Sequence, residues 1–260
     1  RISVTNRCNL KCIFCHAEGY TPSGCNRESC EMKIGEIEKV VKVAADHGIK
    51  SVKLTGGEPL LRWDIVEIVK RISEIEGIEE VSMVSNGVLL APVAKKLKEA
   101  GLQRINVSLH SDDPETYEKI TGGKREMWKE VIRGIKRSKN AGISVKINIV
   151  VLKGINDQKL FDLVRFAEKL GVNVQFIEYH TPYFIRPDFK KFFFSLENFE
   201  KELERIAFKT YEREMHRRKR FLLDSGIYVE TVRPMFNSKF CANCRRIRVV
   251  CYNFKPCLMR

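Results

Sequence analysis

The sequence predicts an α/β protein, a partial (β/α)6 barrel of parallel strands followed by a C-terminal extension. Two observations support this prediction. Short apolar strands alternate with helical patterns through the first part of the chain, which is typical of parallel βαβ units. The rhythm breaks after about residue 185, where Phe184-Ile185-Arg186-Pro187 has the composition of a junction. We therefore expect a barrel over residues 1–185 and an extension over residues 186–260.

Each expected strand is a short run rich in β-branched or apolar residues. The six strands are expected at residues 1–5, 51–54, 81–84, 105–109, 145–151 and 174–179. The helical patterns between them cover residues 33–47, 62–75, 91–99, 126–140 and 157–169. In parallel sheets, ligands bind beyond the carboxyl ends of the strands. The segments that follow the strands are therefore where we expect the functional residues.

Helix boundaries are marked by residues with known end preferences. Asp157 is a candidate N-cap, because its carboxylate can accept from the free backbone nitrogens of a first turn. Glycines mark four helix ends, at Gly48, Gly101, Gly142 and Gly171. In the extension, a helix is expected near residues 196–206 and strands near residues 220–233.

Composition excludes several classes of protein. Hydrophobic residues make up 43% of the chain and charged residues 31%, and no apolar run approaches the length of a membrane span. We therefore expect a soluble, cytoplasmic protein without a membrane partner. Nine cysteines in a chain of 260 residues favour metal ligation over a disulfide scaffold.

The charge is strongly positive and uneven. The net charge is +14, and residues 186–260 hold 18 Lys and Arg against 9 Asp and Glu, a surplus of +9. Such a field attracts polyanions, which include nucleoside triphosphates, RNA and acidic partners. Charge alone does not choose among them. The run Arg217-Arg218-Lys219-Arg220 is interpreted as a solvated helix end rather than a binding site.

Three cysteines, Cys8, Cys12 and Cys15, lie on one loop directly after the first strand. A tetrahedral zinc site or a fully protein-ligated iron–sulfur cubane requires four ligands. A cubane held by three thiolates leaves one iron open for a ligand that is not protein. The alternative is a structural zinc site with Cys25 or Cys30 as the fourth ligand.

Polar residues follow several of the other strands. Gly56-Gly57-Glu58-Pro59 follows the second strand, where two glycines let the backbone approach a ligand and Glu58 can accept from a cationic group. Ser85 and Ser108 place hydroxyls at strand ends, where they suit a ribose or carboxylate or simply an ordinary turn. Asn148 lies on the fifth strand, and Lys153 after it is placed to meet a phosphate.

A second cysteine group closes the chain. Cys241 and Cys244 are followed by Cys257, and Arg246 and Arg248 lie between these thiols. Guanidinium forks match phosphate geometry and stay charged. Three thiolates again leave an open position on a cluster, whereas a zinc knuckle completed by Cys251 is the alternative.

With both cysteine groups in place, the chain resembles the MoaA family of the radical S-adenosylmethionine (SAM) superfamily, the GTP 3′,8-cyclases, and its archaeal members in particular. The likeness runs from Arg1 to Cys257. It implies a TIM-like radical SAM barrel with a C-terminal extension carrying a second iron–sulfur cluster. The implied cofactors are two 4Fe–4S clusters and SAM. The implied lyase reaction converts GTP to 3′,8-cyclo-7,8-dihydro-GTP, the first step of molybdenum cofactor biosynthesis.

The resemblance also assigns roles to individual positions. The first cluster would be held by Cys8, Cys12 and Cys15, and the second by Cys241, Cys244 and Cys257. The positions that match SAM contacts are Phe14, Gly57, Glu58, Ser108, Asn148 and His180. The positions that match GTP contacts are Arg1, Lys53, Ser85, Lys153, Arg246, Ile247 and Arg248.

The partners expected from this resemblance are GTP, a low-potential electron donor and a downstream cyclase that acts on the product. No nucleic-acid partner is expected, and the assembly state is open to a homodimer. Two rival functions remain at this point. One is a radical SAM peptide maturase with an auxiliary cluster, and the other is a zinc-dependent RNA-binding module that uses the basic extension.

Overall fold

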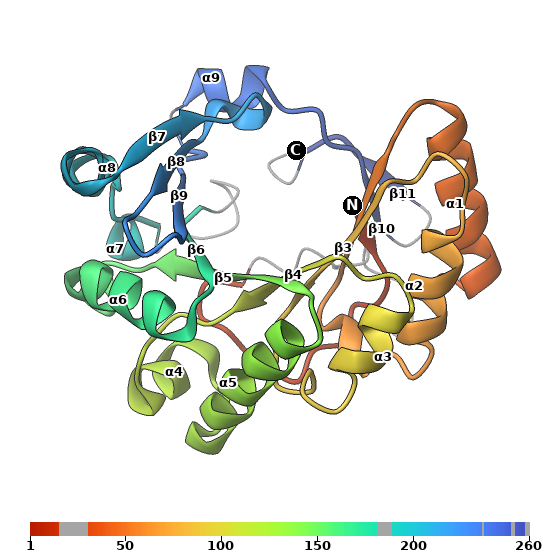
Figure 1. The fold of residues 1–260 in the computed structure, drawn as a ribbon, viewed down its shortest axis with the longest axis horizontal. Coiled ribbons are helices and arrows are strands. Elements are labelled where there is room, and N and C mark those ends of the chain that lie inside the picture. The colour runs from red at the N-terminus through yellow and green to blue at the C-terminus, as the bar shows by residue number, and fades with distance from the viewer. Residues whose placement is uncertain (16–30, 181–188, 236, 251–252, 258–260) are drawn as a thin grey trace.

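The computed structural model describes residues 1–15, 31–180, 189–235, 237–250 and 253–257. An 11-stranded sheet curves into an open barrel, and helices pack on its outer side (Figure 1). The strand order is β11-β10-β1-β2-β3-β4-β5-β6-β9-β8-β7. The expected partial barrel of parallel strands is therefore confirmed. The predicted boundary between residues 185 and 186 lies outside the described residues.

The strands from β1 to β6 pair in parallel and in chain order. Their bounds are β1 (Ile2–Ser3), β2 (Ser51–Thr55), β3 (Glu80–Ser85), β4 (Arg104–Ser108), β5 (Ser144–Val151) and β6 (Asn173–Glu178). The helices that follow them are α1 (Ile34–Asp46), α2 (Ile65–Ser73), α3 (Ala94–Glu99), α4 (Pro114–Thr121), α5 (Arg125–Asn140) and α6 (Leu160–Leu170). These strands match the predicted ones to within a few residues.

The C-terminal part joins both edges of the same sheet. The edge strands at β6 are β7 (Lys209–Glu212), β8 (Lys219–Leu222) and β9 (Tyr228–Val232), and those at β1 are β10 (Arg248–Val250) and β11 (Asn253–Lys255). β9 pairs in parallel with β6, and β10 pairs in parallel with β1. Its helices are α7 (Phe189–Phe192), α8 (Glu197–Ile206) and α9 (Ser238–Ala242). The extension thus contributes both lateral walls of the open barrel.

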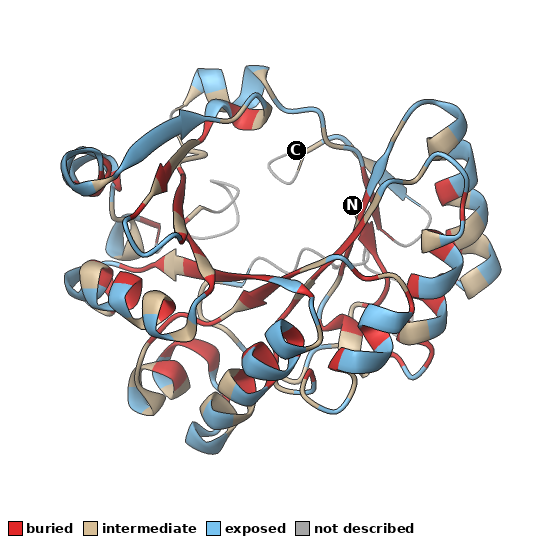
Figure 2. Cartoon of the chain, viewed as in Figure 1, coloured by how far each residue is buried: buried red, intermediate tan, exposed pale blue. Residues whose placement is uncertain are grey.

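The two faces of the strands differ in polarity. The residues that face the helices are apolar and buried, among them Val107 on β4 and Ile147 on β5. The alternate positions of these strands carry Asn106, Lys146 and Asn148, and register places Asn106 beside Lys146. Successive side chains of a strand point to opposite faces. The apolar core therefore lies between sheet and helices (Figure 2), and the inner face of the barrel is polar.

Three local predictions were wrong. The helix α4 was not predicted, although Asp113 caps it and Gly122 ends it in the left-handed conformation. Asp157 does not cap α6. It lies in a 3-10 turn, Asp157–Lys159, and its Oδ1 accepts from the backbone nitrogen of Gly154. The run from Arg217 to Arg220 is not a solvated helix end throughout: a 3-10 turn ends at Arg217, but Arg218 is buried and β8 begins at Lys219.

The described helices include none that is long and apolar enough to cross a bilayer.

A buried ion pair ties three segments of the barrel together at the start of α2. The Arg62 guanidinium binds both oxygens of Asp64, at 2.8 and 2.7 Å, and both side chains are less than 10% exposed. The same guanidinium donates to the carbonyl oxygens of Val4 and Met32, both at 2.8 Å. All of these acceptors lose their donor if Arg62 is removed.

We expect Arg62→Gln to lower the free energy of unfolding by about 3–5 kcal/mol, because breaking a buried pair leaves an uncompensated charge. Urea denaturation followed by circular dichroism measures this. The matched control is Arg71→Gln, whose exposed side chain pairs with Glu67 and Glu38 on the surface, and we expect no measurable change for it. Equal losses for the two variants would contradict this assignment.

Candidate functional site

The cysteine loop is held against the end of α4. The backbone nitrogens of Lys11 and Ile13 donate to the carbonyl oxygens of Thr121 and Ile120, both at 2.9 Å. Within the loop, the nitrogen of Cys15 donates to Cys12 O at 3.0 Å. The helix that sequence reasoning missed is therefore the support on one side of the predicted cluster loop.

The Gly56-Gly57 turn supports the same loop from the other side. Gly57 N donates to Thr5 O at 2.8 Å, and Glu58 N donates to Arg7 O at 2.7 Å. A Cβ atom on Gly57 would lie 2.1 Å from Arg7 O, and one on Gly56 would lie 2.2 Å from Thr5 O. The backbone that these glycines approach so closely is that of the strand and loop before the cysteines.

Glu58 is fully buried and accepts three hydrogen bonds. Its Oε1 accepts from Leu60 N at 3.0 Å and from Ser85 Oγ at 2.8 Å, and its Oε2 accepts from Asn86 N at 2.6 Å. Burial raises the pKa of this carboxyl, and the three donors oppose that shift. Asn86 Nδ2 in turn donates to Asn9 Oδ1 in the cysteine loop, at 2.7 Å. Glu58 and Ser85, which we predicted for different ligands, are thus direct partners.

The three thiols Cys8, Cys12 and Cys15 are neighbours whose charges affect one another. Burial, together with the charges of Cys15 and Cys8, raises the pKa of Cys12 to about 12. In the described part of the chain, no three His, Cys, Asp or Glu side chains already stand close enough together to hold a metal ion. Thiolates are the ligands that iron–sulfur clusters use, and a bound cation favours the charged form. The donor set fits the cluster that the sequence predicts.

Phe14 lies beside the cysteines and packs against a buried histidine. Its ring meets His110 edge-on, with the ring centroids 4.6 Å apart. Burial lowers the pKa of His110 to about 3, so the imidazole is neutral. His110 Nδ1 accepts from Val150 N at 3.0 Å. Phe14 thereby joins an apolar cluster with Ile120 and Tyr179 that shields one side of the loop.

The other positions predicted for SAM line the strand ends. Ser108 ends β4 and is half-buried, and register pairs it with Asn148 on β5. Asn148 Oδ1 accepts from Asn106 Nδ2 at 2.9 Å and from Gln175 Nε2 at 3.3 Å. His180 lies two residues beyond β6, and its Nδ1 lies 3.2 Å from Glu178 O.

Several positions predicted for GTP meet at the β1 edge. Parallel pairing sets Ile2 beside Val249, the Arg1 backbone nitrogen donates to Ile247 O at 2.8 Å, and Val249 N donates to Arg1 O at 2.9 Å. Burial, together with the positive charges of Arg1, Arg218 and Arg248, lowers the pKa of Arg246 to about 9. Arg1, Arg246 and Arg248 therefore share one positive region.

Lys53 points into the barrel from β2. Its Nζ donates to Asn106 Oδ1 at 3.1 Å. Burial lowers the pKa of Lys53 well below its usual range, and the positive charges of Arg104, Arg1 and Arg246 lower it further. Lys153 differs, because it is exposed, and no described interaction joins it to Lys53 or Arg246. Its backbone nitrogen donates to Phe192 O at 2.9 Å.

A hairpin lies between Cys244 and Cys257 of the second cysteine group. β10 pairs with β11 in antiparallel register, with Arg248 beside Lys255. The nitrogen of Cys244 donates to Cys241 O at 3.1 Å. Cys251, the candidate fourth ligand of a zinc knuckle, lies outside the described residues, as do Cys25 and Cys30.

Sequence reasoning missed a charged cluster on the inner face. Lys146 on β5 and Arg218 before β8 both pair with Glu230 on β9. The polar alternation of β5, with Lys146 and Asn148 two residues apart, was the available signal. His216 was also missed. The backbone φ of His216 is +66°, and its ring stacks on Phe240 with the ring centroids 4.0 Å apart. The backbone nitrogen of His216 donates to Asn243 O at 3.0 Å.

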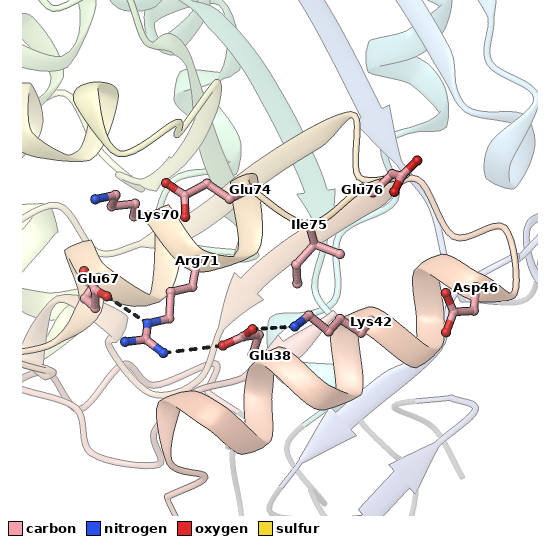
Figure 3. Close-up of a pocket in the computed structure, with 9 residues that line it drawn as sticks. All are labelled: Glu38, Lys42, Asp46, Glu67, Lys70, Arg71, Glu74, Ile75 and Glu76. Carbon is pink, nitrogen blue, oxygen red and sulfur yellow. Dashed lines mark hydrogen bonds and ion pairs between the residues drawn. The ribbon is translucent and has the colours of Figure 1, made fainter.

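A groove on the outer surface between α1 and α2 is lined mainly by charged side chains (Figure 3). Glu38 pairs with Lys42 and Arg71, and Arg71 also pairs with Glu67. These charges compensate one another, and the groove carries no chemistry of its own.

Solved structures share this fold. The Streptococcus suis protein SuiB bound to S-adenosylmethionine superposes with a TM-score of 0.72 at 16% identity, over 99% of this chain and 59% of that one. The same protein bound to its precursor peptide SuiA gives a TM-score of 0.70 at 17% identity, over 99% and 58%. At this level of identity the likeness concerns the fold alone.

Sequence comparison identifies the family. Residues 2–167 match the family described as the radical SAM superfamily. The probable GTP 3′,8-cyclase of Thermococcus kodakarensis is 46% identical over 266 residues, covering 100% of this chain and 84% of the relative. That of Methanosarcina acetivorans is 43% identical over 263 residues, covering 100% and 77%. The chain therefore belongs to the radical SAM superfamily and, within it, to the family of the archaeal GTP 3′,8-cyclases.

Proposed function

We propose that this radical SAM enzyme is a GTP 3′,8-cyclase that converts GTP to 3′,8-cyclo-7,8-dihydro-GTP in molybdenum cofactor biosynthesis. The observation that carries the proposal is the surplus of buried positive charge on the inner face of the barrel. On this face Lys146 and Arg218 are buried, and Lys53 and Arg246 are half-buried. Buried charges of one sign require a counter-ion. A triphosphate supplies several negative charges and suits guanidinium forks.

The two ends of the proposed site differ in chemistry. The loop with Cys8, Cys12 and Cys15 would hold the first 4Fe–4S cluster, and the segment with Cys241, Cys244 and Cys257 would hold the second. SAM would lie near Phe14, Gly57, Glu58, Ser108, Asn148 and His180 at the strand ends. GTP would lie between, held by Arg1, Lys53, Ser85, Lys153, Arg246, Ile247 and Arg248.

When bound, the first cluster and SAM supply a 5′-deoxyadenosyl radical, which is the reactive chemistry of this superfamily. The residues of the chain position the reactants and exclude water. Phe14 packs against the apolar cluster around Tyr179 and so fixes one side of the cysteine loop. The cations fix the phosphates, so that the ribose is held at one place relative to that loop. The proposal also requires a low-potential electron donor and a downstream cyclase for the product.

The peptide-maturase alternative has no comparable support among the described side chains. A peptide substrate does not require several buried cations on the inner wall. Membership of the radical SAM superfamily likewise favours an enzyme over a zinc-dependent RNA-binding module.

The metal content is the first test. Anaerobically reconstituted protein should bind about eight irons per chain, because each of the two cubane clusters contains four. Replacing Cys8, Cys12 and Cys15 together with Ala should leave about four. Iron and sulfide analysis with zinc analysis in parallel decides this, and zinc bound in place of iron at the C-terminal cysteines would remove the support for the second cluster.

The glycine turn offers a test that leaves every cysteine in place. We expect Gly57→Ala to lose the iron of the first cluster and to keep that of the second, because its Cβ would displace the backbone at Arg7 O. Gly35→Ala is the control, since a Cβ there has no neighbour within 4 Å. A full iron content in Gly57→Ala would show that the loop tolerates the shift.

Substrate charge is tested with Arg246→Ala and Arg248→Ala. Each charge-assisted bond to phosphate is worth roughly 1.5–3 kcal/mol, so each variant should bind GTP roughly ten- to a hundredfold more weakly. Calorimetry measures the affinity. Formation of 5′-deoxyadenosine without substrate should persist, because the first cluster is untouched. Unchanged GTP affinity in both variants would favour the peptide maturase.

A further inference from the structure

One arginine of the basic run is turned into the barrel. Arg218 is 8% exposed, whereas its neighbour Arg217 is exposed and pairs with Glu212 on the surface. The Arg218 Nη1 atom lies 2.8 Å from Glu230 Oε1 and donates to Gln175 Oε1 at 3.1 Å. Its Nε is buried and has no hydrogen-bond partner among the described residues. The guanidinium is thus held in place with a donor to spare.

The carboxylate of Glu230 is shared by three cations. Lys146 Nζ lies 2.5 Å from Glu230 Oε2, and Arg213 Nη1 lies 3.3 Å from Oε1. Glu230 has 1% of its side chain exposed, Lys146 and Arg218 have 7% each, and Arg213 has 32%. Three positive charges against one negative charge leave this cluster with a surplus of two. Such a surplus in a buried place is costly unless an anion joins it.

The charges of the cluster are set by burial and by one another. Burial opposes ionisation of Glu230, but the charges of Arg218 and Lys146 outweigh it and lower the pKa of Glu230 to about 2. Burial lowers the pKa of Lys146 to about 8 against the pull of Glu230, and that of Arg218 to about 10. At neutral pH Glu230, Lys146 and Arg218 are therefore charged. Glu230 therefore acts as a counter-ion that keeps the cations gathered.

Hydrogen bonds connect this cluster to the proposed GTP site. Gln175 accepts from Arg218 and donates to Asn148, Asn148 accepts from Asn106, and Asn106 accepts from Lys53. Arg218 also lowers the pKa of Arg246 across the barrel. In this cluster Lys146 lies on β5, Glu230 lies on β9 and Arg218 immediately precedes β8. In the sheet, β3 and β4 separate β5 from β2, which carries Lys53. The cations thus line the inner face from both lateral walls.

We propose that Arg218 and Lys146, gathered on Glu230, form a further anion subsite that binds the polyphosphate chain of the substrate. The subsite rests on the proposed function for the identity of that substrate. Arg218 would donate from its free Nε and its planar guanidinium, and Lys146 would contribute the compact charge of its ammonium group. Because Glu230 holds both side chains before substrate binds, little side-chain entropy remains to be lost on binding.

The test compares three probes on the anaerobically reconstituted, full-length chain, namely GTP, guanosine and inorganic triphosphate. Arg218→Gln should weaken the binding of GTP and of inorganic triphosphate by roughly ten- to a hundredfold. The affinity for guanosine should stay unchanged, because the guanidinium contacts only phosphate. Arg217→Gln is the matched control, with the same change one residue away on the surface, and all three affinities should stay within about twofold of the unsubstituted protein.

The outcomes separate this subsite from the function on which it rests. If Arg218→Gln binds GTP and inorganic triphosphate as tightly as the unsubstituted protein does, the subsite is wrong and the GTP cyclase proposal stands. If the unsubstituted protein binds inorganic triphosphate in an Arg218-dependent way but does not bind GTP, the subsite stands and the substrate is wrong. An equal loss for guanosine would mean a general distortion and would overturn the subsite.

Iron content and a thermal melt check that Arg218→Gln is folded. Should it fail that check, Arg218→Lys provides the test, since it keeps a positive charge for Glu230 and removes the planar fork. Affinity for inorganic triphosphate should then fall by roughly tenfold, because a single ammonium replaces a bidentate donor. An unchanged affinity in this folded variant would overturn the proposal equally.

Discussion

The close approach of the Gly56-Gly57 turn to the backbone before the cysteines is the constraint on which the rest of the site depends. Two hydrogen bonds of 2.8 and 2.7 Å join Gly57 and Glu58 to Thr5 O and Arg7 O, and there is no room for a side chain at either glycine. Because Glu58 also holds the end of β3 through Ser85 and Asn86, one turn sets the relative position of β1, β2 and β3. The cysteine loop begins from a rigid base.

The inner face of the sheet is polar, which is unusual for parallel strands. Such strands are ordinarily apolar on both sides, because helices cover both faces. Here the helices cover only the outer face (Figure 2), and the inner face carries a chain of side-chain hydrogen bonds from Lys53 to Arg218. The amide side chains of Asn106, Asn148 and Gln175 lie between Lys53 and Arg218. Asn106 accepts from Lys53, and Gln175 accepts from Arg218. A packed core in this place would leave no room for a substrate.

Both lateral walls of the barrel come from the C-terminal part of the chain. β9 extends the sheet beyond β6, and Arg233 anchors it by pairing with Glu178 on β6 and Glu200 on α8. β10 extends the sheet beyond β1 and sets Arg1 beside Ile247. Residues more than two hundred positions apart therefore share one positive region. These two pairings bring Arg218 and Arg248, which are both buried, to the two lateral walls.

Patterns that act over a few residues could be predicted from the sequence. The order of strands and helices follows from periodicity, and both cysteine groups are visible as spacings. Local patterns failed where a distant partner decides the outcome. The run from Arg217 to Arg220 resembles a solvated surface, yet Glu230 draws Arg218 inside, because burial of that charge is tolerable only beside a carboxylate.

What the sequence by itself determined is the order of the six parallel strands and most of the helices between them, because these patterns depend on neighbours along the chain. Only the tertiary structure decided which distant side chains meet. The antiparallel pairing of β10 with β11 sets Arg248 beside Lys255, and the parallel pairing of β1 with β10 brings Arg1 beside Ile247. Register between distant strands is selected by the packing of the whole sheet, so no short stretch of residues contains it.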